Sequence, residues 1–192
     1  MVEKDNKERM VTLVRQAKLG DASSFAKLYE MICQDLYRTA LYRLGNPEDA
    51  ENVVGDTVLD AYAGIGRLKD ETAFKAWIFR ILYNKCNRMI KSYMTRRDIE
   101  TAQSVDEMAE TLATTQNDIE NAEAKTMIRD AFSVLSDEEK QIVTMTIYGE
   151  YDSGEISRLL GMNRNTVRSK YSRALVKMRD RLSGQSIYSG LR

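Results

Sequence analysis

The segment 155–182, EISRLLGMNRNTVRSKYSRALVKMRDRL, carries side chains that could read double-stranded DNA. It holds eight Lys/Arg against two acids, a net charge of +6 in a chain whose total charge is zero. Arginine pairs bidentately with guanine in the major groove, Asn and Ser/Thr meet other base edges, and further basic residues neutralise phosphates. The predicted DNA contacts in this segment are Arg164, Asn165, Thr166, Arg168, Ser169, Ser172, Arg173 and Lys177.

A helix-turn-helix is the element that would position these side chains. Residues 153–160 predict a short helix, Gly161 permits a left-handed turn that Met162 would plug, and Asn163 suits the N-cap of the next helix. An apolar stripe recurs at helical spacing in that second helix, at Val167, Tyr171, Ala174/Leu175 and Met178. An ordinary amphipathic helix with a basic exterior would share this pattern, so the motif alone does not define the kind of regulator.

A second concentration of positive charge, residues 75–97, has seven bases and no acid. Phe74 and Trp77 lie within or beside it, and single-stranded DNA is bound by positive charge combined with aromatic rings on which bases stack. Both rings could instead be plain core residues, and each basic block could be a solvated helix face. Acidic segments flank this block, with a net charge of −5 over 45–72 and −8 over 98–124. Two basic blocks in a neutral chain favour two contacts on one polyanion.

The rest of the sequence predicts helices. The 192 residues include one proline and ten glycines, and 43% are apolar, which is typical of a packed all-α protein. Helices are expected over 8–19, 22–44, 47–65 and about 72–95, with Asp21 and Asn46 as N-caps, Pro47 in a first helical position, and a capping box of Ser136 with Glu139. We predict two small helical domains, 8–97 and 123–183, joined by an acidic linker, 98–122, and followed by a tail, 184–192.

Several classes of site and protein are disfavoured by composition. Histidine is absent, and Cys33 and Cys86 lie far apart, so we expect no zinc site, no disulfide framework and two buried thiols. No Gly-rich phosphate loop or nucleophile–base pair suggests an enzyme, and we expect no cofactor. The charged start, MVEKDNKER, and the lack of an 18-residue apolar run predict a cytoplasmic protein without a signal peptide or membrane span.

Three stretches follow one another along the chain: DAENVVGDTVLDAY (49–62), FKAWIFRILYNKCNRMIK (74–91) and LSDEEKQIVTMTIYGEYDSGEISRLLGMNRNTVRSKYSRALVKMR (135–179). Together they resemble the bacterial sigma factors of the extracytoplasmic-function (ECF) group of the sigma-70 family. LVRQAKLGDASSFAKLYE (13–30) is also similar to the first conserved region of that group. The resemblance implies that the N-terminal domain, sigma region 2, binds core RNA polymerase and the promoter −10 element. It implies that the C-terminal domain, region 4, binds the −35 element and the polymerase flap.

The resemblance also implies roles for residues of the N-terminal domain. The acidic helix over 47–60 would face the polymerase clamp coiled coil, with contacts at Asp49, Glu51, Asn52, Asp56 and Thr57. The loop 67–72 would capture a flipped −10 base, and the helix after it would hold the −10 DNA. The implied −10 contacts are Lys69, Phe74, Lys75, Trp77, Arg80, Asn84 and Arg88. Two residues depart from the family pattern: Gly55 stands where Gln is usual, and Arg88 where Asp is usual.

The expected function is that of a sigma factor, which binds core polymerase, directs it to promoters and opens the −10 region. The chain would be a monomer outside the holoenzyme, with core polymerase and promoter DNA as partners. ECF factors are often held by an anti-sigma protein, but no residue here reveals one. The 98–124 segment would run through polymerase, either mimicking nucleic acid or serving as a solvated tether. Two alternatives stay open: a free-standing helix-turn-helix repressor or activator, and an adaptor that binds proteins rather than DNA.

Overall fold

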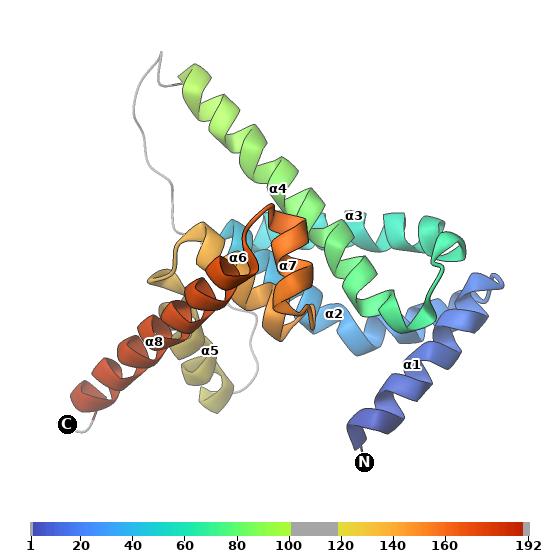
Figure 1. Cartoon of the computed structure of the whole chain (residues 1–192), viewed down its shortest axis with the longest axis horizontal. Coiled ribbons are helices and arrows are strands. Elements are labelled where there is room, and N and C mark those ends of the chain that lie inside the picture. Colours follow the sequence, from blue (N-terminus) through green and yellow to red (C-terminus); the bar gives the residue numbers. More distant parts are fainter. Residues whose placement is uncertain (1, 101–118, 190–192) are drawn as a thin grey trace. The chain divides into compact units, whose positions relative to one another are not determined.

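The computed structural model describes the backbone of residues 2–100 and 119–189, and all regular elements in these ranges are helices (Figure 1). The chain divides into two compact units, Met1–Leu112 and Ala113–Arg192. The prediction of an all-α fold with two helical domains is confirmed. The predicted linker is shorter than expected, because residues 98–100 continue one helix and residues 119–122 begin another. The remainder of that linker, 101–118, lies outside the described residues.

The first unit is built from four helices and two short 3-10 turns. These elements are α1 (Val2–Lys18), α2 (Ala22–Leu44), α3 (Pro47–Gly64), η1 (Ile65–Arg67), η2 (Glu71–Ala73) and α4 (Phe74–Glu100). Helices α2, α3 and α4 pack against one another, and α1 packs against α2 and both 3-10 turns. Their shared core is made of large side chains that are almost fully buried, such as Leu28, Leu36, Phe74, Phe79 and Leu82.

The predicted caps of this unit are confirmed. The side chain of Asp21 accepts a hydrogen bond from the backbone N–H of Ser23 at 2.9 Å and begins α2. Asn46 caps α3 in the same way, and Pro47 occupies a first position of that helix. Side-chain oxygens satisfy N–H groups that no helical carbonyl can reach, so these helices begin where local chemistry dictates.

The second unit contains α5 (Ile119–Ser133), α6 (Asp137–Ile147), α7 (Ser153–Leu160) and α8 (Arg164–Ser189). Helix α8 packs against each of the other three. The predicted capping box at the start of α6 is confirmed: the backbone N–H of Ser136 donates to the Glu139 carboxylate at 2.9 Å, and the N–H of Glu139 donates to Ser136 Oγ at 3.3 Å. Ile142, Val143 and Ile156 are fully buried beneath α8 or beside it.

The turn between α6 and α7 needs a glycine. A Cβ on Gly149 would lie 2.7 Å from the Tyr151 ring and 2.9 Å from the carbonyl oxygen of Met145. Glu150 follows in the left-handed region, with φ of 57°. The tight turn lets the Tyr151 ring fold back into the core, where it is 6% exposed. Asp152 then caps α7, so the turn sets where the helix-turn-helix begins.

The two cysteines are free thiols. Cys86 is buried as expected, and burial raises the pKa of its thiol to about 12, so the thiol stays protonated at neutral pH. Cys33 is half-buried, which corrects the expectation of two buried thiols. Within the described ranges, no helix is long and apolar enough to cross a membrane.

Gly55 offers a test of helix α3. It lies exposed in the helix interior, and nothing lies within 4 Å of the position that its Cβ would take. Gly55→Ala is therefore expected to raise the free energy of unfolding by about 0.5–1 kcal/mol, because alanine loses less backbone entropy. Urea unfolding measures the change. Gly64→Ala is the matched control, since its Cβ would lie 3.3 Å from the Trp77 ring and should cancel the gain. No stabilisation by Gly55→Ala would contradict the open helix surface.

Candidate nucleic-acid interface

Helices α7 and α8 form the predicted helix-turn-helix. Gly161 ends α7 in the left-handed region, with φ of 64°, and the backbone N–H of Met162 donates to the carbonyl of Ser157 at 3.0 Å. Asn163 Oδ1 accepts from the N–H of Asn165 at 2.8 Å and so acts as the N-cap of α8. The left-handed residue and the cap are confirmed, and Met162 between them is half-buried.

The inner face of α8 follows the predicted apolar stripe with one correction. Val167 is 1% exposed and Ala174 is fully buried, whereas Tyr171 and Met178 are half-buried. Leu175 is 39% exposed, so Ala174 is the core member of the 174/175 pair. The buried stripe is narrow, and its centre is formed by two small side chains seven residues apart.

The outer face of α8 presents most of the predicted −35 contacts to solvent. All seven of these side chains are exposed: Arg164, Asn165, Thr166, Arg168, Ser169, Ser172 and Arg173. Arg164 Nε donates to Ser153 Oγ at 3.1 Å, and Arg173 Nε donates to the backbone carbonyl of Ser169 at 3.2 Å. Both bonds orient the guanidinium through Nε. The terminal nitrogens of these two arginines make no hydrogen bond to the described residues.

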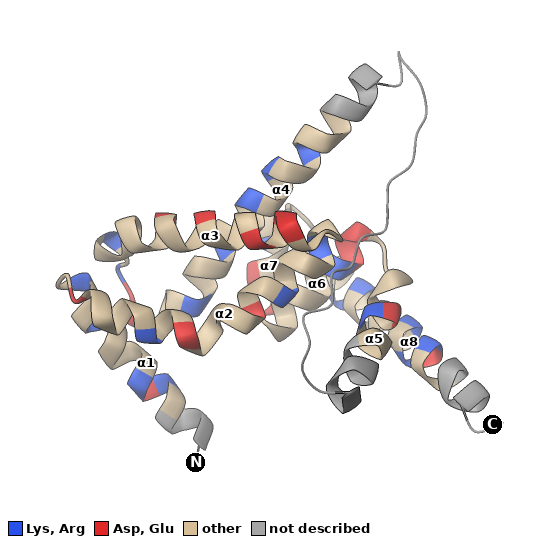
Figure 2. Ribbon diagram, turned by 180° about the vertical axis from the view of Figure 1, so that it is seen from behind, with Lys and Arg blue, Asp and Glu red and all other residues tan. Residues whose placement is uncertain are grey.

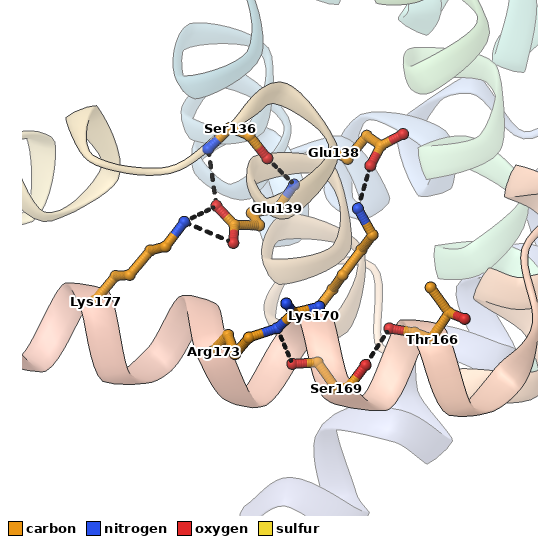
Figure 3. A network of polar contacts seen from close by, with 8 residues as sticks. All are labelled: Ser136, Glu138, Glu139, Thr166, Ser169, Lys170, Arg173 and Lys177. Carbon is orange, nitrogen blue, oxygen red and sulfur yellow. Dashed lines mark hydrogen bonds and ion pairs between the residues drawn. The ribbon is translucent and has the colours of Figure 1, made fainter.

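A second set of cations on α8 faces the protein instead (Figure 3). Lys170 Nζ donates to Glu138, and Lys177 Nζ donates to both carboxylate oxygens of Glu139 at 2.9 Å. Lys177 was predicted as a DNA contact; in the structure its side chain is 48% exposed, and its ammonium is paired with a nearly buried carboxylate. Sequence reasoning also missed Glu138. The spacing of the two lysines, seven residues on one helix face, is the signal that could have found their partners.

Among the residues of the second unit whose burial is described, Glu139 is the most buried acid, with 7% of the residue exposed. Burial raises the pKa of Glu139. Hydrogen bonds from Lys177 and Ser136 together lower it by more, so the net pKa lies below its usual value. The carboxylate is therefore ionised at neutral pH. A further ion pair joins Arg181 of α8, which is itself exposed, to Asp130 of α5 at 3.2 Å.

In the first unit, the loop before α4 is anchored by α1. Asp70 accepts from the N–H of Thr72 at 2.9 Å and from its hydroxyl at 2.6 Å, and these hydrogen bonds lower the pKa of Asp70. Glu71 forms ion pairs with Lys18 and, at 3.9 Å, with Arg15 of α1; the Lys18 hydrogen bond is the main cause that lowers the pKa of Glu71. Glu71 thus ties the loop to α1, while Asp70 holds the local turn by bonding Thr72. Sequence analysis did not assign α1 this role.

The predicted −10 residues divide into exposed and buried sets. Lys69, Arg80, Asn84 and Arg88 are exposed, and Trp77 is half-buried against Gly64. Two further residues are less available. Phe74 is 1% exposed, which confirms the alternative of a core residue and corrects its assignment as a −10 contact, because it cannot stack on a base in this structure. Lys75 is half-buried, and its ammonium lies 3.8 Å from the carboxylate of Asp35.

Helix α3 displays its acids beside the basic helix α4 (Figure 2). Glu51, Asn52 and Asp56 are exposed as the clamp prediction requires, whereas Asp49 is half-buried and accepts a hydrogen bond from the Tyr93 hydroxyl at 2.7 Å. Thr57 does not fit the predicted polymerase contact. Its side chain is fully buried and donates to the carbonyl of Val53 at 2.7 Å. A residue in the core cannot contact a protein partner.

Acids of the same helix bind α4. Lys85 Nζ lies 2.7 Å from the carboxylate of Asp60 and 3.9 Å from that of Asp56. The Lys85 side chain is 13% exposed, whereas that of Asp56 is 69% exposed. The Asp56 side chain therefore has Lys85 on one side and is open to solvent on the other.

Comparison with known families resolves what the two units are. The family model for Sigma-70 region 2 matches residues 28–96, and that for Sigma-70, region 4 matches residues 125–178. The chain belongs to the sigma-70 family. Region 2 thus covers most of α2, all of α3 and most of α4, and region 4 covers the helix-turn-helix with the helices before it.

Similar curated proteins are sigma factors of the ECF group, which agrees with the expected subgroup. ECF RNA polymerase sigma factor BldN of Streptomyces coelicolor is 26% identical over 168 residues, which are 87% of this chain and 63% of BldN. ECF RNA polymerase sigma factor SigM of Mycobacterium tuberculosis is 26% identical over 162 residues, covering 83% of this chain and 77% of SigM. The chain thus spans less than two thirds of BldN.

A solved structure shares the fold. It is the sigma factor RpoE in complex with the anti-sigma factor NepR from Bartonella quintana, with a TM-score of 0.64 and 18% identity over 84% of this chain and 98% of RpoE. The family regions and this fold together give names to the two units. The α7–α8 motif lies in region 4, and the acidic α3 and basic α4 lie in region 2.

Proposed function

We propose that this sigma-70 family chain binds core RNA polymerase, directs it to specific promoters and opens their −10 region. The single observation that carries the proposal is the presence of regions 2 and 4 in order on one chain, each with its basic helix. A protein that only bound DNA would not need region 2 with its acidic α3. The chain acts as an initiation factor and catalyses no reaction of its own.

Reading of the −35 element is assigned to the exposed face of α8. The first turns of a recognition helix enter the major groove, where the N-terminal residues meet base edges. Arg168 and Arg173 lie on this face with their terminal nitrogens outside any hydrogen bond to the described residues. Asn165 and Ser169 offer further donors and acceptors. The proposed base-reading face of α8 ends before Lys177, whose ammonium forms an ion pair with Glu139.

Opening of the −10 element is assigned to the loop before α4 and to the exposed basic residues of that helix. Lys69, Arg80 and Arg88 supply charge for the DNA backbone, and Trp77 and Asn84 supply a ring edge and an amide at the surface. Unstacking a base costs a few kcal/mol, so a site that binds the flipped base favours melting without ATP. The ion pairs of Glu71 with α1 hold this loop, and the hydrogen bonds of Asp70 to Thr72 shape its turn.

The polymerase clamp coiled coil is assigned to the exposed acids of α3, with Glu51, Asn52 and Asp56 as contacts and Asp49 at the edge. The polymerase flap is assigned to region 4. Because core polymerase is cytoplasmic, the chain would act in the cytoplasm. An anti-sigma protein is a further partner that we propose, supported by the complex of the similar RpoE with NepR.

In vitro transcription tests the proposed function. Purified chain is added to core polymerase with fragmented genomic DNA, and RNA 5′ ends are mapped. The expected result is a set of chain-dependent start sites that share sequence at −35 and −10. Absence of chain-dependent transcripts, together with tight sequence-specific DNA binding by the chain alone, would instead identify a free-standing regulator.

A further inference from the structure

Two adjacent acids of α6 hold two lysines of the recognition helix. Lys170 pairs with Glu138, and Lys177 pairs with both oxygens of Glu139 (Figure 3). Lysines seven residues apart lie on the same face of a helix, two turns from each other. The contacts join residues that are 32 and 38 positions apart in sequence. They are therefore contacts between two helices, and they hold α8 against α6.

The apolar packing of α8 is one-sided, which gives these ion pairs a geometric role. Val167 and Ala174 form the buried row, and Tyr171 and Met178 flank it at i+4. On the other flank, at i+3 from each buried residue, stand the two lysines. Val167 and Ala174 are small, so they resist rotation of the helix weakly. A rotation of about 20° displaces an atom roughly 8 Å from the axis by about 3 Å, the length of a hydrogen bond.

We propose that Glu138 and Glu139 are positioning residues for promoter recognition, holding Lys170 and Lys177 so that the rotation of α8 presents Arg168 and Arg173 to the −35 bases. The inference rests on the proposed reading of the −35 element by α8. It divides the basic residues of that helix into two classes: cations that set the geometry and cations that meet DNA.

The lysines of the first class do not neutralise phosphates. The Glu139 side chain is 9% exposed, and its carboxylate also accepts the N–H of Ser136 at the start of α6. Moving Lys177 to a phosphate would leave this nearly buried carboxylate without its counter-charge, which is costly. Lys170 has 26% of its side chain exposed and is likewise engaged. Both therefore keep their carboxylate partners while the helix lies on DNA.

A charge-reversal cycle at the Glu138–Lys170 pair tests the proposal. Glu138 lies outside the capping box, and its side chain is 56% exposed, so its reversal removes no capping hydrogen bond of α6. The variants are Glu138→Lys, Lys170→Glu and the double exchange, each as the full chain with core polymerase. The probe is a promoter from the transcription experiment, randomised over its −35 element, from which bound sequences are recovered.

Each single variant is expected to lose roughly tenfold in affinity for the wild-type −35 sequence and to recover a changed base preference. The double exchange is expected to restore both affinity and preference to within about twofold, because the pair is re-formed with its signs exchanged. The slope of log affinity against log salt should match the wild-type slope in the double exchange, since no phosphate contact is lost.

Four results would overturn the proposal or the function on which it rests. A double exchange as weak as Lys170→Glu, with a salt slope reduced by about 0.9, would make Lys170 a phosphate contact. Single variants that bind less but recover the wild-type sequence would reduce the pair to a stabilising role. A wild-type chain that selects no −35 sequence would overturn the proposed function itself. Should Lys170→Glu fail to fold by circular dichroism, Lys170→Gln replaces it, and an unchanged base preference in that variant would also overturn the proposal.

Discussion

Arg168→Ala is expected to lower transcription from the chain's own promoter by roughly five- to 150-fold, which corresponds to about 1–3 kcal/mol. Arg168 is exposed on the outer face of α8 and makes no hydrogen bond or ion pair with the described residues, so its guanidinium is available for a bidentate contact with a base. The accompanying loss of base preference should be confined to one position of the −35 element. Transcription of promoters substituted at each −35 position, one at a time, measures it.

The control for Arg168→Ala is Arg129→Ala on α5. Arg129 is also exposed in the second unit but lies outside the helix-turn-helix, so its removal changes the charge equally and should leave transcription unaffected. Equal losses in both variants would show that overall charge, rather than a base contact, accounts for the effect. Normal transcription by Arg168→Ala would contradict its assignment to the base-reading face.

Asp56→Lys is expected to weaken association with core polymerase by roughly 30-fold or more, since charge reversal at an interface costs several kcal/mol when like charges meet. The Asp56 side chain is 69% exposed on α3. The reversal also replaces a carboxylate that lies 3.9 Å from the Lys85 ammonium with a cation, and repulsion between the two favours an outward orientation of the new lysine. Binding of labelled chain to core polymerase, followed by fluorescence anisotropy, gives the change.

Two controls separate the clamp contact from other consequences of Asp56→Lys. Glu30→Lys makes the same charge change on an exposed site of α2. Asp60→Asn removes the 2.7 Å partner of Lys85 without altering a predicted contact. Both should bind polymerase nearly as the wild type does. Wild-type affinity of Asp56→Lys would contradict the clamp assignment, and a loss shared by Asp60→Asn would trace the effect to the α3–α4 ion pairs.

Features set by local chemistry could be predicted from the sequence. Asp21, Asn46 and Ser136 cap helices because short polar side chains satisfy N–H groups two or three residues ahead. Gly161 ends α7 because a left-handed residue is needed there. Such interactions span a few residues, so the order of residues alone contains them. The all-α fold follows from composition and helical periodicity, whereas the two sigma regions are inferred from the resemblance of three stretches to the ECF group.

Features set by contacts between distant residues could not be predicted. Lys177 and Arg173 look alike in the sequence, but one faces Glu139 across 38 positions and the other faces solvent. Phe74 and Thr57 lie in segments rich in charge, yet both are buried because α2, α3 and α4 meet there. Periodicity places a residue on a helix face, but the neighbouring helix decides which flank of that face is covered.

The ion pairs of Glu71 bear on how short a functional fragment of this chain can be. Lys18 and Arg15 stand upstream of residue 28, where the match to region 2 begins, and yet they anchor the loop before α4. A truncated chain starting at residue 28 would retain all of the exposed −10 residues and lose the anchor of their loop. Promoter melting would then fail in a fragment that still carries the whole of region 2.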